Sequence, residues 1–281
     1  MTEKLTDTVF SIIIVNYNSG ALLTGCLASI FQNLEEGYEI IIYDNASSDA
    51  SLSRIAAQFP GDKRIRIVEG KENLGFAKAN NLAARVSSGK YLHFLNPDIV
   101  VNSALAGDYR TIAQDDLDGV YVTSLASEDG HLLKNRHIIP TLGNYWICIF
   151  NKKKVAYWNI GASLIIRRES FERIGGWPED YFMYAEDMDL FYILHRDHIP
   201  VTYFDTRLVH IGKGTTRQIW SESQRALKVE LSFRRFFRKH DIPLQYFVIR
   251  PILLLFVLFH EPGGFYLQVK TFIRVLFIRT R

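Results

Sequence analysis

Cysteine and long apolar runs are both scarce in this sequence. Its 281 residues include only two cysteines, Cys26 and Cys148, so neither a disulfide framework nor a zinc site is indicated. The longest apolar run, 252–259, is shorter than the roughly 18 to 20 residues that span a bilayer. The first apolar run, 12–15, is too short for a signal peptide. We therefore expect a protein that stays on the cytoplasmic side.

Two phosphate-binding motifs are also missing. The sequence has no G-x-G-x-x-G after its first predicted strand and no G-x-x-x-x-G-K-[ST], which disfavours a dinucleotide-binding fold and a P-loop. The 33 basic and 30 acidic residues nearly balance, so charge gives no reason to expect nucleic-acid binding, which needs a clustered basic face. With 48% hydrophobic residues, the chain can form one large domain with a small appendage.

Short β-branched runs alternate with helical patterns in the first hundred residues. This order predicts βαβ units in an α/β fold with a mostly parallel sheet and helices on both faces. The expected strands are 10–15, 39–43, 64–68 and 91–95. Further on, we expect helices near 104–113 and 186–196, strands at 119–123, 162–166 and 201–204, and a loop-like region up to Lys154. Residues 217–281 are predicted to form a C-terminal helical extension divided by Pro243, Pro251 and Pro262.

Polar residues follow each of the first four predicted strands. They are Asn16 to Asn18, Asp44 to Asp49, Asn73 to Phe76 and Asn96 to Asp98. Any one of these segments is compatible with ordinary turn chemistry, but ligands bind beyond the carboxyl ends of parallel strands. Four such segments at one sheet edge favour a shared site. There Asp98 is suited to a divalent cation that neutralises a diphosphate, and Asp44 to hydrogen bonds from a nucleoside.

At this point the sequence resembles a known family, the second family of glycosyltransferases, and within it the bacterial rhamnosyltransferases of O-antigen and other cell-envelope polysaccharides. The matching motifs occur in the family's order over about residues 10 to 216. They are Ser11 to Asn18, Asp44 to Asp49, Asn73 to Asn81, Phe94 to Asp98, Gly161 to Leu164, Gly175 to Leu190 and His210 to Thr216. The resemblance implies a nucleotide-sugar-binding GT-A fold over residues 1–216 and inverting, metal-dependent sugar transfer.

The resemblance also implies a role for individual residues. Asp187 is expected to be the general base, with Glu186 beside it, and Trp177 and Tyr184 to shape the acceptor site. Asp98 is expected to bind Mg²⁺ or Mn²⁺ as the second acid of a D-x-D motif. Donor binding is assigned to Asn16, Asn18, Asp44, Asn73, Gly75, Phe76, Lys78 and Asn96.

Two positions qualify the predicted metal site. The first acid of D-x-D is replaced by Asn96, and a neutral ligand leaves less negative charge around the cation. His210 resembles a late histidine that ligates the metal in related folds, and an imidazole ligand would favour Mn²⁺. A lone histidine after a strand is at least as often structural, so both interpretations of His210 stay open.

The segment from Trp177 to Asp189 interleaves aromatic and acidic residues. Its aromatic side chains could form a packed lid or core. Flat apolar faces beside hydrogen-bonding acids are also what a sugar site needs. Because clustered carboxylates repel each other, the segment needs compensation from a helix N-terminus, a cation or a ligand.

The C-terminal region is rich in aromatic and basic residues, and 265–281 contains four cations and no acid. Three interpretations are open: a packed helical hairpin, an oligomer interface, or an anchor lying in a lipid interface. The last is favoured, because acceptors in such pathways are lipid-linked. We expect a peripheral protein at the inner face of the plasma membrane, with possible homo-oligomerisation.

Three functions compete. The first is transfer of a sugar, with L-rhamnose from dTDP-L-rhamnose as the first choice, to a lipid-linked glycan. The second is a non-catalytic module that binds nucleotide sugar or glycan; the intact Glu186 and Asp187 pair argues against it and Asn96 mildly for it. The third, nucleotidyl transfer, would need a glycine-rich basic loop after the first strand, which the sequence lacks.

Overall fold

The computed structural model describes residues 8–116, 118–212, 220–260 and 262–278. Their centre is an eight-stranded sheet with the order β3-β2-β1-β4-β9-β6-β10-β5. Strands β1 to β4 are parallel, whereas β9 runs antiparallel to both of its neighbours. The strand bounds are β1 Phe10–Asn16, β2 Tyr38–Asp44, β3 Ile65–Glu69, β4 Tyr91–Leu95, β5 Ile99–Val100, β6 Val120–Ala126, β9 Ser163–Arg167 and β10 Val201–His210. The predicted mostly parallel α/β sheet is confirmed.

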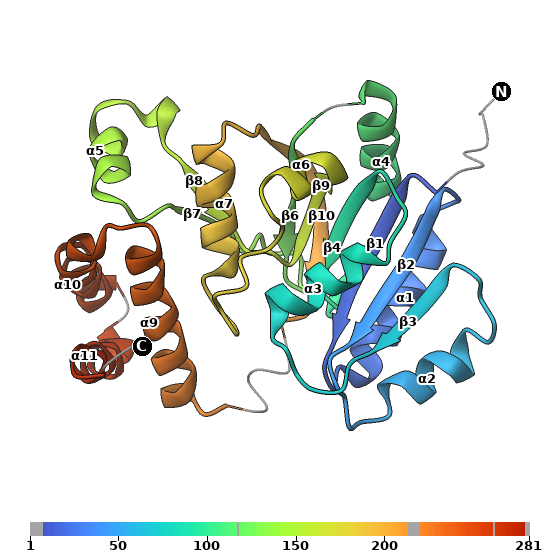
Figure 1. Cartoon of the computed structure of the whole chain (residues 1–281), viewed down its shortest axis with the longest axis horizontal. Coiled ribbons are helices and arrows are strands. Elements are labelled where there is room, and N and C mark those ends of the chain that lie inside the picture. The colour runs from blue at the N-terminus through green and yellow to red at the C-terminus, as the bar shows by residue number, and fades with distance from the viewer. Residues whose placement is uncertain (1–7, 117, 213–219, 261, 279–281) are drawn as a thin grey trace.

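Helices cover both faces of the sheet, because successive residues of a buried strand point to opposite sides. In β1, Ile12 and Ile14 pack into one core cluster and Ile13 into the other. The first cluster is covered by α1 Gly20–Asn33, α2 Ser51–Gln58 and α4 Ala104–Asp115. The second is covered by α3 Phe76–Arg85, α6 Arg168–Arg173 and α7 Glu186–Arg196 (Figure 1).

The predicted loop-like region before Lys154 contains regular structure, which corrects that expectation. Helix α5 (Leu142–Phe150) and the short 3-10 turn η1 (Lys152–Lys154) lie within it, flanked by the paired strands β7 (Arg136–Ile138) and β8 (Tyr157–Asn159). Helix α5 has only nine residues, and the six from 145 to 150 form a continuous apolar run, which periodicity alone cannot assign to a helix or a strand. Strand β10 also extends to His210, six residues beyond the predicted end at Phe204.

The C-terminal region folds into three helices, α9 Glu222–Lys239, α10 Pro243–His260 and α11 Pro262–Leu276. Pro243 and Pro262 begin helices, as proline can at a first turn. Pro251 was expected to divide two segments, but it lies inside α10. The continuous helix has 18 residues with a mean hydropathy of 1.6. By length and composition alone, this helix is long and apolar enough to cross a membrane. This corrects the expectation, drawn from the short run 252–259, that no segment approaches that length.

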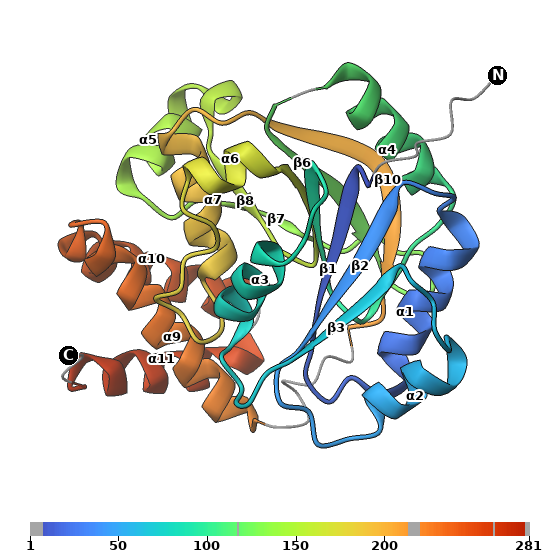
Figure 2. The ribbon, with the colours of Figure 1, turned by 45° about the vertical axis from the view of Figure 1, so that its right-hand side comes forward.

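The carboxyl ends of β1, β2 and β4 lie at one edge of the sheet, because these strands are parallel and adjacent. Figure 2 shows β1 and β2 side by side. The chain after β10 and the start of α7 border the same region. The fold therefore brings these parts of the sequence, together with the segments after β3 and before β9, around one cavity.

Candidate active site

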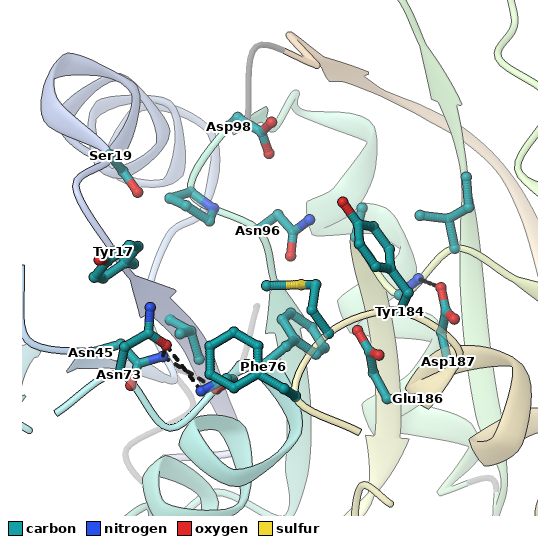
Figure 3. Close-up of a pocket in the computed structure, with 18 of the residues that line it drawn as sticks. Tyr17, Ser19, Asn45, Asn73, Phe76, Asn96, Asp98, Tyr184, Glu186 and Asp187 are labelled. Atoms are coloured by element: carbon teal, nitrogen blue, oxygen red, sulfur yellow. Dashed lines mark hydrogen bonds between the residues drawn. The ribbon is translucent and has the colours of Figure 1, made fainter. Parts of the chain in front are cut away.

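A cavity of about 550 Å³ opens at this edge of the sheet. Figure 3 shows two opposed sides, with Asn96 between them. We call Tyr17, Asn45 and Asn73 the amide wall, and Tyr184, Glu186 and Asp187 the carboxylate wall. Of the predicted site residues, nine line the cavity: Asn73, Gly75, Phe76, Asn96, Asp98, Tyr184, Glu186, Asp187 and His210.

Asn16 and Asp44 lie behind the amide wall in a buried hydrogen-bond network. The amide Nδ2 of Asn16 lies 2.6 Å from Asp44 Oδ1, 3.0 Å from Ser47 Oγ and 2.8 Å from Ser51 Oγ. Asp44 Oδ2 also accepts from the backbone N–H of Ser47, at 3.0 Å. Asn16 is fully buried and Asp44 is 3% exposed. These contacts hold the loops after β1 and β2 together, and the predicted nucleotide contact of the two residues stays a prediction.

Amide side chains also fix the loops of the amide wall itself. Asn45 donates to Asn73 Oδ1 at 2.9 Å and accepts from the N–H of Leu74 at 2.8 Å. Asn18 accepts from the backbone N–H groups of Ser48 and Asp49, at 2.7 and 3.2 Å. Polar loops with such bonds need little rearrangement to receive a ligand.

Gly75 and Phe76 connect the amide wall to the aromatic segment on the other side. Gly75 has φ +82°, a conformation that L side chains rarely adopt, and a Cβ there would collide with the backbone carbonyl of Phe182. The N–H of Phe76 donates to the same carbonyl oxygen at 3.2 Å. Lys78 lies one turn further along α3 with an exposed side chain, outside the cavity lining. Its predicted donor role remains untested.

Asp98 and His210 meet at one end of the cavity. Asp98 follows β4, His210 ends β10, and His210 Nε2 lies 3.3 Å from Asp98 Oδ2. The described residues contain no group of three or more His, Cys, Asp or Glu side chains placed to hold a metal. One carboxylate and one imidazole are fewer ligands than a divalent cation takes, so a cation here would need diphosphate oxygens to complete its coordination.

The carboxylate wall begins helix α7. Asp187 Oδ1 accepts from the N–H of Met188 at 2.8 Å and its Oδ2 from the N–H of Gly161 at 3.4 Å. Glu186 is 6% exposed, and its Oε2 has no hydrogen-bond partner among the described residues. An unpartnered carboxylate oxygen beside a cavity is costly unless it is protonated or meets a ligand.

Burial changes the protonation of this pair. It raises the pKa of Asp187 to about 6, although backbone hydrogen bonds from Met188 and Gly161 oppose the change. Burial, together with the charge of Asp187, raises the pKa of Glu186 to about 8. Near neutral pH the two carboxyl groups therefore hold one proton between them. An ionised carboxylate with a raised pKa is a suitable general base.

Asp189 attaches α7 to the C-terminal helices. Its fully buried carboxylate lies 2.5 Å from His240 Nε2 and 2.8 Å from Lys239 Nζ, at the end of α9. Lys239 Nζ also lies 2.5 Å from Asp180 in the aromatic segment. The first turn of α7, which presents Glu186 and Asp187, is thus fixed to α9 by buried charges.

The aromatic residues beside the cavity differ in accessibility. Trp177 is 1% exposed and lies behind Gly161, where its ring meets Phe76 edge-on at 5.2 Å. Tyr184 lines the cavity itself. Phe182 and Trp220 line it too, with ring centroids 6.2 Å apart. The predicted acceptor contacts of Trp177 and Tyr184 are not tested by this arrangement.

Several lining residues were not predicted as site residues: Tyr17, Asn45, Phe182 and Trp220. Tyr17 and Asn45 lie in the polar segments after β1 and β2, so position alone could have identified them. Phe182 belongs to the aromatic and acidic segment. Trp220 has no comparable signal, because it follows the motif region in sequence and reaches the cavity only through the path of the chain after β10.

The site can be compared with known proteins. The sequence matches glycosyl transferase family 2 over residues 11–175. It is 25% identical to the low-salt glycan biosynthesis hexosyltransferase Agl10 of Haloferax volcanii over 206 residues. That match covers 68% of this chain and 63% of the relative, so the chain spans less than two thirds of that protein's length.

Two further similarities bear on the site. Identity is 25% over 222 residues to the N-acetylglucosaminyl-diphospho-decaprenol L-rhamnosyltransferase of Mycobacterium tuberculosis, covering 66% of this chain and 70% of that one. The mannosyltransferase PcManGT of Pyrobaculum calidifontis, solved with GDP-Man and Mn²⁺, superposes with a TM-score of 0.60 at 19% identity, covering 98% of this chain and 77% of that one. This last likeness shows the GT-A fold. The family match spans more than half of the sequence, and the chain belongs to glycosyl transferase family 2.

Proposed function

We propose that this glycosyltransferase moves a sugar from a nucleoside diphosphate to an acceptor hydroxyl with inversion at the anomeric carbon. The observation that carries the proposal is the position of the buried pair Glu186 and Asp187. The pair faces the same cavity as Asp98 and His210, so a proton acceptor and a cation site border one ligand.

In the proposed reaction, Asp187 takes the proton of the acceptor hydroxyl. The hydroxyl oxygen forms a bond to the anomeric carbon from the face opposite the leaving group. The bond between that carbon and the diphosphate oxygen breaks, and the nucleoside diphosphate leaves with the bonding electron pair. Protonated Glu186 donates a hydrogen bond within the pair or to the acceptor and keeps the acceptor hydroxyl oriented.

The charge that develops on the diphosphate needs a counterpart at the opposite end of the cavity. Asp98 and His210 would hold the divalent cation there, with Asn96 beside them. When bound, Mg²⁺ or Mn²⁺ supplies Lewis-acid stabilisation of the leaving group. On the other side of the donor, we assign the nucleoside to the loops of the amide wall, including Asn73, with Asn16, Asn18 and Asp44 supporting them.

The relatives suggest the substrates. The name of the mycobacterial relative describes rhamnosyl transfer to a lipid diphosphate-linked sugar, so we propose L-rhamnose from dTDP-L-rhamnose and a lipid-linked glycan acceptor. Tyr184, Phe182 and Trp220 offer aromatic faces for the acceptor sugar, supported from behind by Trp177. Such an acceptor fits synthesis of O-antigen or another envelope polysaccharide, with the protein peripheral at the inner face of the plasma membrane.

A panel of nucleotide sugars, each incubated with and without a lipid-linked acceptor extract, tests this function. We expect acceptor-dependent release of one nucleoside diphosphate, lost on chelation, and a product anomeric configuration opposite to that of the donor. Asp98→Ala should abolish the metal dependence of donor binding, and Asp205→Ala, an exposed acid on β10, should not. If donor binds but no acceptor supports release, the alternative of a non-catalytic binding module, favoured by Asn96, replaces the proposal.

A further inference from the structure

Helix α10 carries a continuous apolar face that the protein leaves uncovered. Seven of its large apolar residues are between 47% and 78% exposed, as single residues or adjacent pairs three to four positions apart: Leu244, Phe247, Val248, Ile252, Leu255, Phe256 and Phe259. Such spacing places them on one side of the helix over about four turns. The opposite side, which includes Tyr246 and Ile249, is buried against the rest of the protein. A stripe of this length marks an interaction surface.

Helix α5 extends this surface from a distant part of the sequence. Trp146, Ile149 and Phe150 are 67 to 70% exposed. The N–H of Leu142, at the start of α5, donates to Gln245 Oε1 in α10 at 2.8 Å. Figures 1 and 2 both place α5 and α10 at the end of the molecule away from α2. Two apolar helices about 100 residues apart in sequence therefore lie together.

The charged residues within these helices have one sign, although Asp241 precedes α10 and Glu261 follows it in the sequence. Helices α5, α10 and α11 and the turn η1 contain no Asp or Glu. The exposed Lys152, Lys153 and Lys154 of η1 follow α5 directly. An apolar face with an aromatic residue and flanking lysines matches the interface of an anionic bilayer. A second copy of the chain would instead bring lysines against lysines.

We propose that α5, η1 and the exposed face of α10 form one docking surface for an anionic lipid bilayer. This deepens, and rests on, the proposed membrane association of the transferase. It also assigns contact to α5, which lies outside the C-terminal region that sequence reasoning had singled out.

The helix α10 lies in the interface and does not cross it. Arg250 projects to the protein side, where its Nε lies 2.7 and 3.0 Å from the two carboxylate oxygens of Glu230 in α9. Tyr246 donates to the same carboxylate at 2.7 Å, and Glu230 is 3% exposed. A spanning α10 would break this buried pair and carry Arg250 into hydrocarbon, which is costly.

Vesicle co-sedimentation of the full chain tests the surface. We expect binding to phosphatidylcholine vesicles that contain phosphatidylglycerol, and a loss of about tenfold or more in Trp146→Ser/Ile149→Ser/Phe150→Ser. Phe256→Ser/Phe259→Ser should weaken binding similarly. The control Ile67→Ser/Leu132→Ser replaces two exposed apolar residues, one on β3 and one before β7, and should bind as the parent does. Replacing the three lysines of η1 by Gln should remove the preference for phosphatidylglycerol.

Cys148 provides a second readout, because it lies within α5 and is partly exposed, whereas Cys26 is buried. Burial raises the pKa of the Cys26 thiol, so a thiol-reactive, polarity-sensitive dye should label Cys148 selectively. Addition of phosphatidylglycerol vesicles should shift its emission to the blue. No shift, or parental vesicle binding by the α5 variant, would remove α5 from the surface.

Other outcomes separate this inference from the proposed function. If the parent is a dimer in solution that the α5 substitutions make monomeric without affecting vesicle binding, the surface binds a second copy and the bilayer proposal fails. Donor hydrolysis without vesicles should be equal in the parent and the α5 variant. If the protein transfers sugar but does not bind vesicles, only the proposed docking surface is wrong. A protein that binds vesicles but transfers no sugar overturns the proposed function alone.

Discussion

The amide wall and the carboxylate wall face the same cavity but differ in how their polar groups are satisfied. In the amide wall Asn45 bonds to Asn73 and to loop backbone, and behind the wall Asn16 bonds to Asp44 and Ser51. On the other side, Glu186 Oε2 has no hydrogen-bond partner among the described residues, and the buried Nε1 of Trp177 has none either. The amide side is closer to a finished scaffold, although the buried Ser19 Oγ, which lines the cavity there, also lacks a partner among the described residues. The other retains groups whose partners only a substrate or a proton can supply, which is common where chemistry occurs.

This contrast predicts opposite effects of substitution on the two sides. Polar groups behind the amide wall should contribute stability, and changing them should act on donor binding through the loops. Polar groups of the carboxylate wall should cost stability and carry the reaction. Four experiments, ordered by expected effect, test the difference.

The largest effect is expected from Asp187→Asn, which keeps the shape of the side chain but cannot accept a proton. We expect turnover to fall roughly a hundred- to ten-thousand-fold, the usual contribution of a general base. Donor affinity, measured by calorimetry with cation present, should be unchanged. Glu186→Gln is the matched variant and should cost less. If Glu186→Gln is inactive while Asp187→Asn transfers normally, the base is Glu186.

The next effect concerns pH. Because burial raises the pKa of Asp187 to about 6, the ionised base is lost as pH falls through that value. We expect kcat/KM to decrease about tenfold per pH unit below roughly pH 6. Initial rates across a pH series, with protein folding checked at each point, measure this limb. The residual activity of Asp187→Asn should not decrease in this way below pH 6. If kcat/KM of the parent decreases only near pH 4, the raised pKa of Asp187 is wrong.

Asn16→Ala tests the amide side. Loss of its buried hydrogen bonds to Asp44 and Ser51 should lower the free energy of unfolding by about 1 to 3 kcal/mol, measured by urea titration. Donor affinity should fall as well, because the loops after β1 and β2 lose their common support. Asn33→Ala is the control: it removes bonds to the carbonyls of Ser29 and Val101, away from the cavity. If donor affinity is unchanged in Asn16→Ala, the loops after β1 and β2 keep their positions without the Asn16 hydrogen bonds.

The smallest effect is expected for the stability of Glu186→Gln. This substitution should raise the free energy of unfolding, whereas Asn16→Ala lowers it. Burial and the charge of Asp187 raise the pKa of Glu186 from 4.5 to about 8. The folded state therefore binds this proton more tightly than the unfolded state, so the parent loses stability as pH rises from 4.5 towards 8. The variant avoids that loss and should be about 1 to 2 kcal/mol more stable above pH 8, with no gain below about pH 4. If Glu186→Gln is less stable than the parent at every pH, the buried Glu186 carboxylate does not destabilise the folded protein.

Sequence patterns were most informative where local and global signals agree. The β-branched runs and polar strand ends of the first hundred residues predicted β1 to β4 and the edge where the cavity lies, because every parallel strand there ends in residues typical of turns. The motifs predicted that Asp98, Glu186, Asp187 and His210 would matter, and all four line the cavity. The strands and Asp98 were predicted from residue order and the geometry of a parallel sheet, whereas Glu186, Asp187 and His210 were expected from the family resemblance, and the roles of all four stay predictions.

Burial and long-range contacts could not be read in the same way. No pattern shows that Trp177 lies behind Gly161, that Trp220 lines the cavity, or that the buried Asp189 contacts His240, which follows α9. Helix α5 was not predicted, because its short apolar run, 145–150, fits a strand as well as a helix. The sequence also left open whether the pKa of Asp187 is raised or lowered, because the helix N-terminus and the neighbouring acids act in opposite directions. Burial, which raises this pKa, is visible only in the structure.

The contact between Gly75 and Phe182 has a consequence for engineering. The segment that follows β3 and the aromatic segment before α7 share a backbone hydrogen bond, from Phe76 N–H to the Phe182 carbonyl, at a point where no side chain fits. Neither segment can change its path without the other. Grafting one of them alone from a relative would therefore open a gap or a clash at this junction, and a chimera intended to alter sugar preference must exchange both segments as a unit.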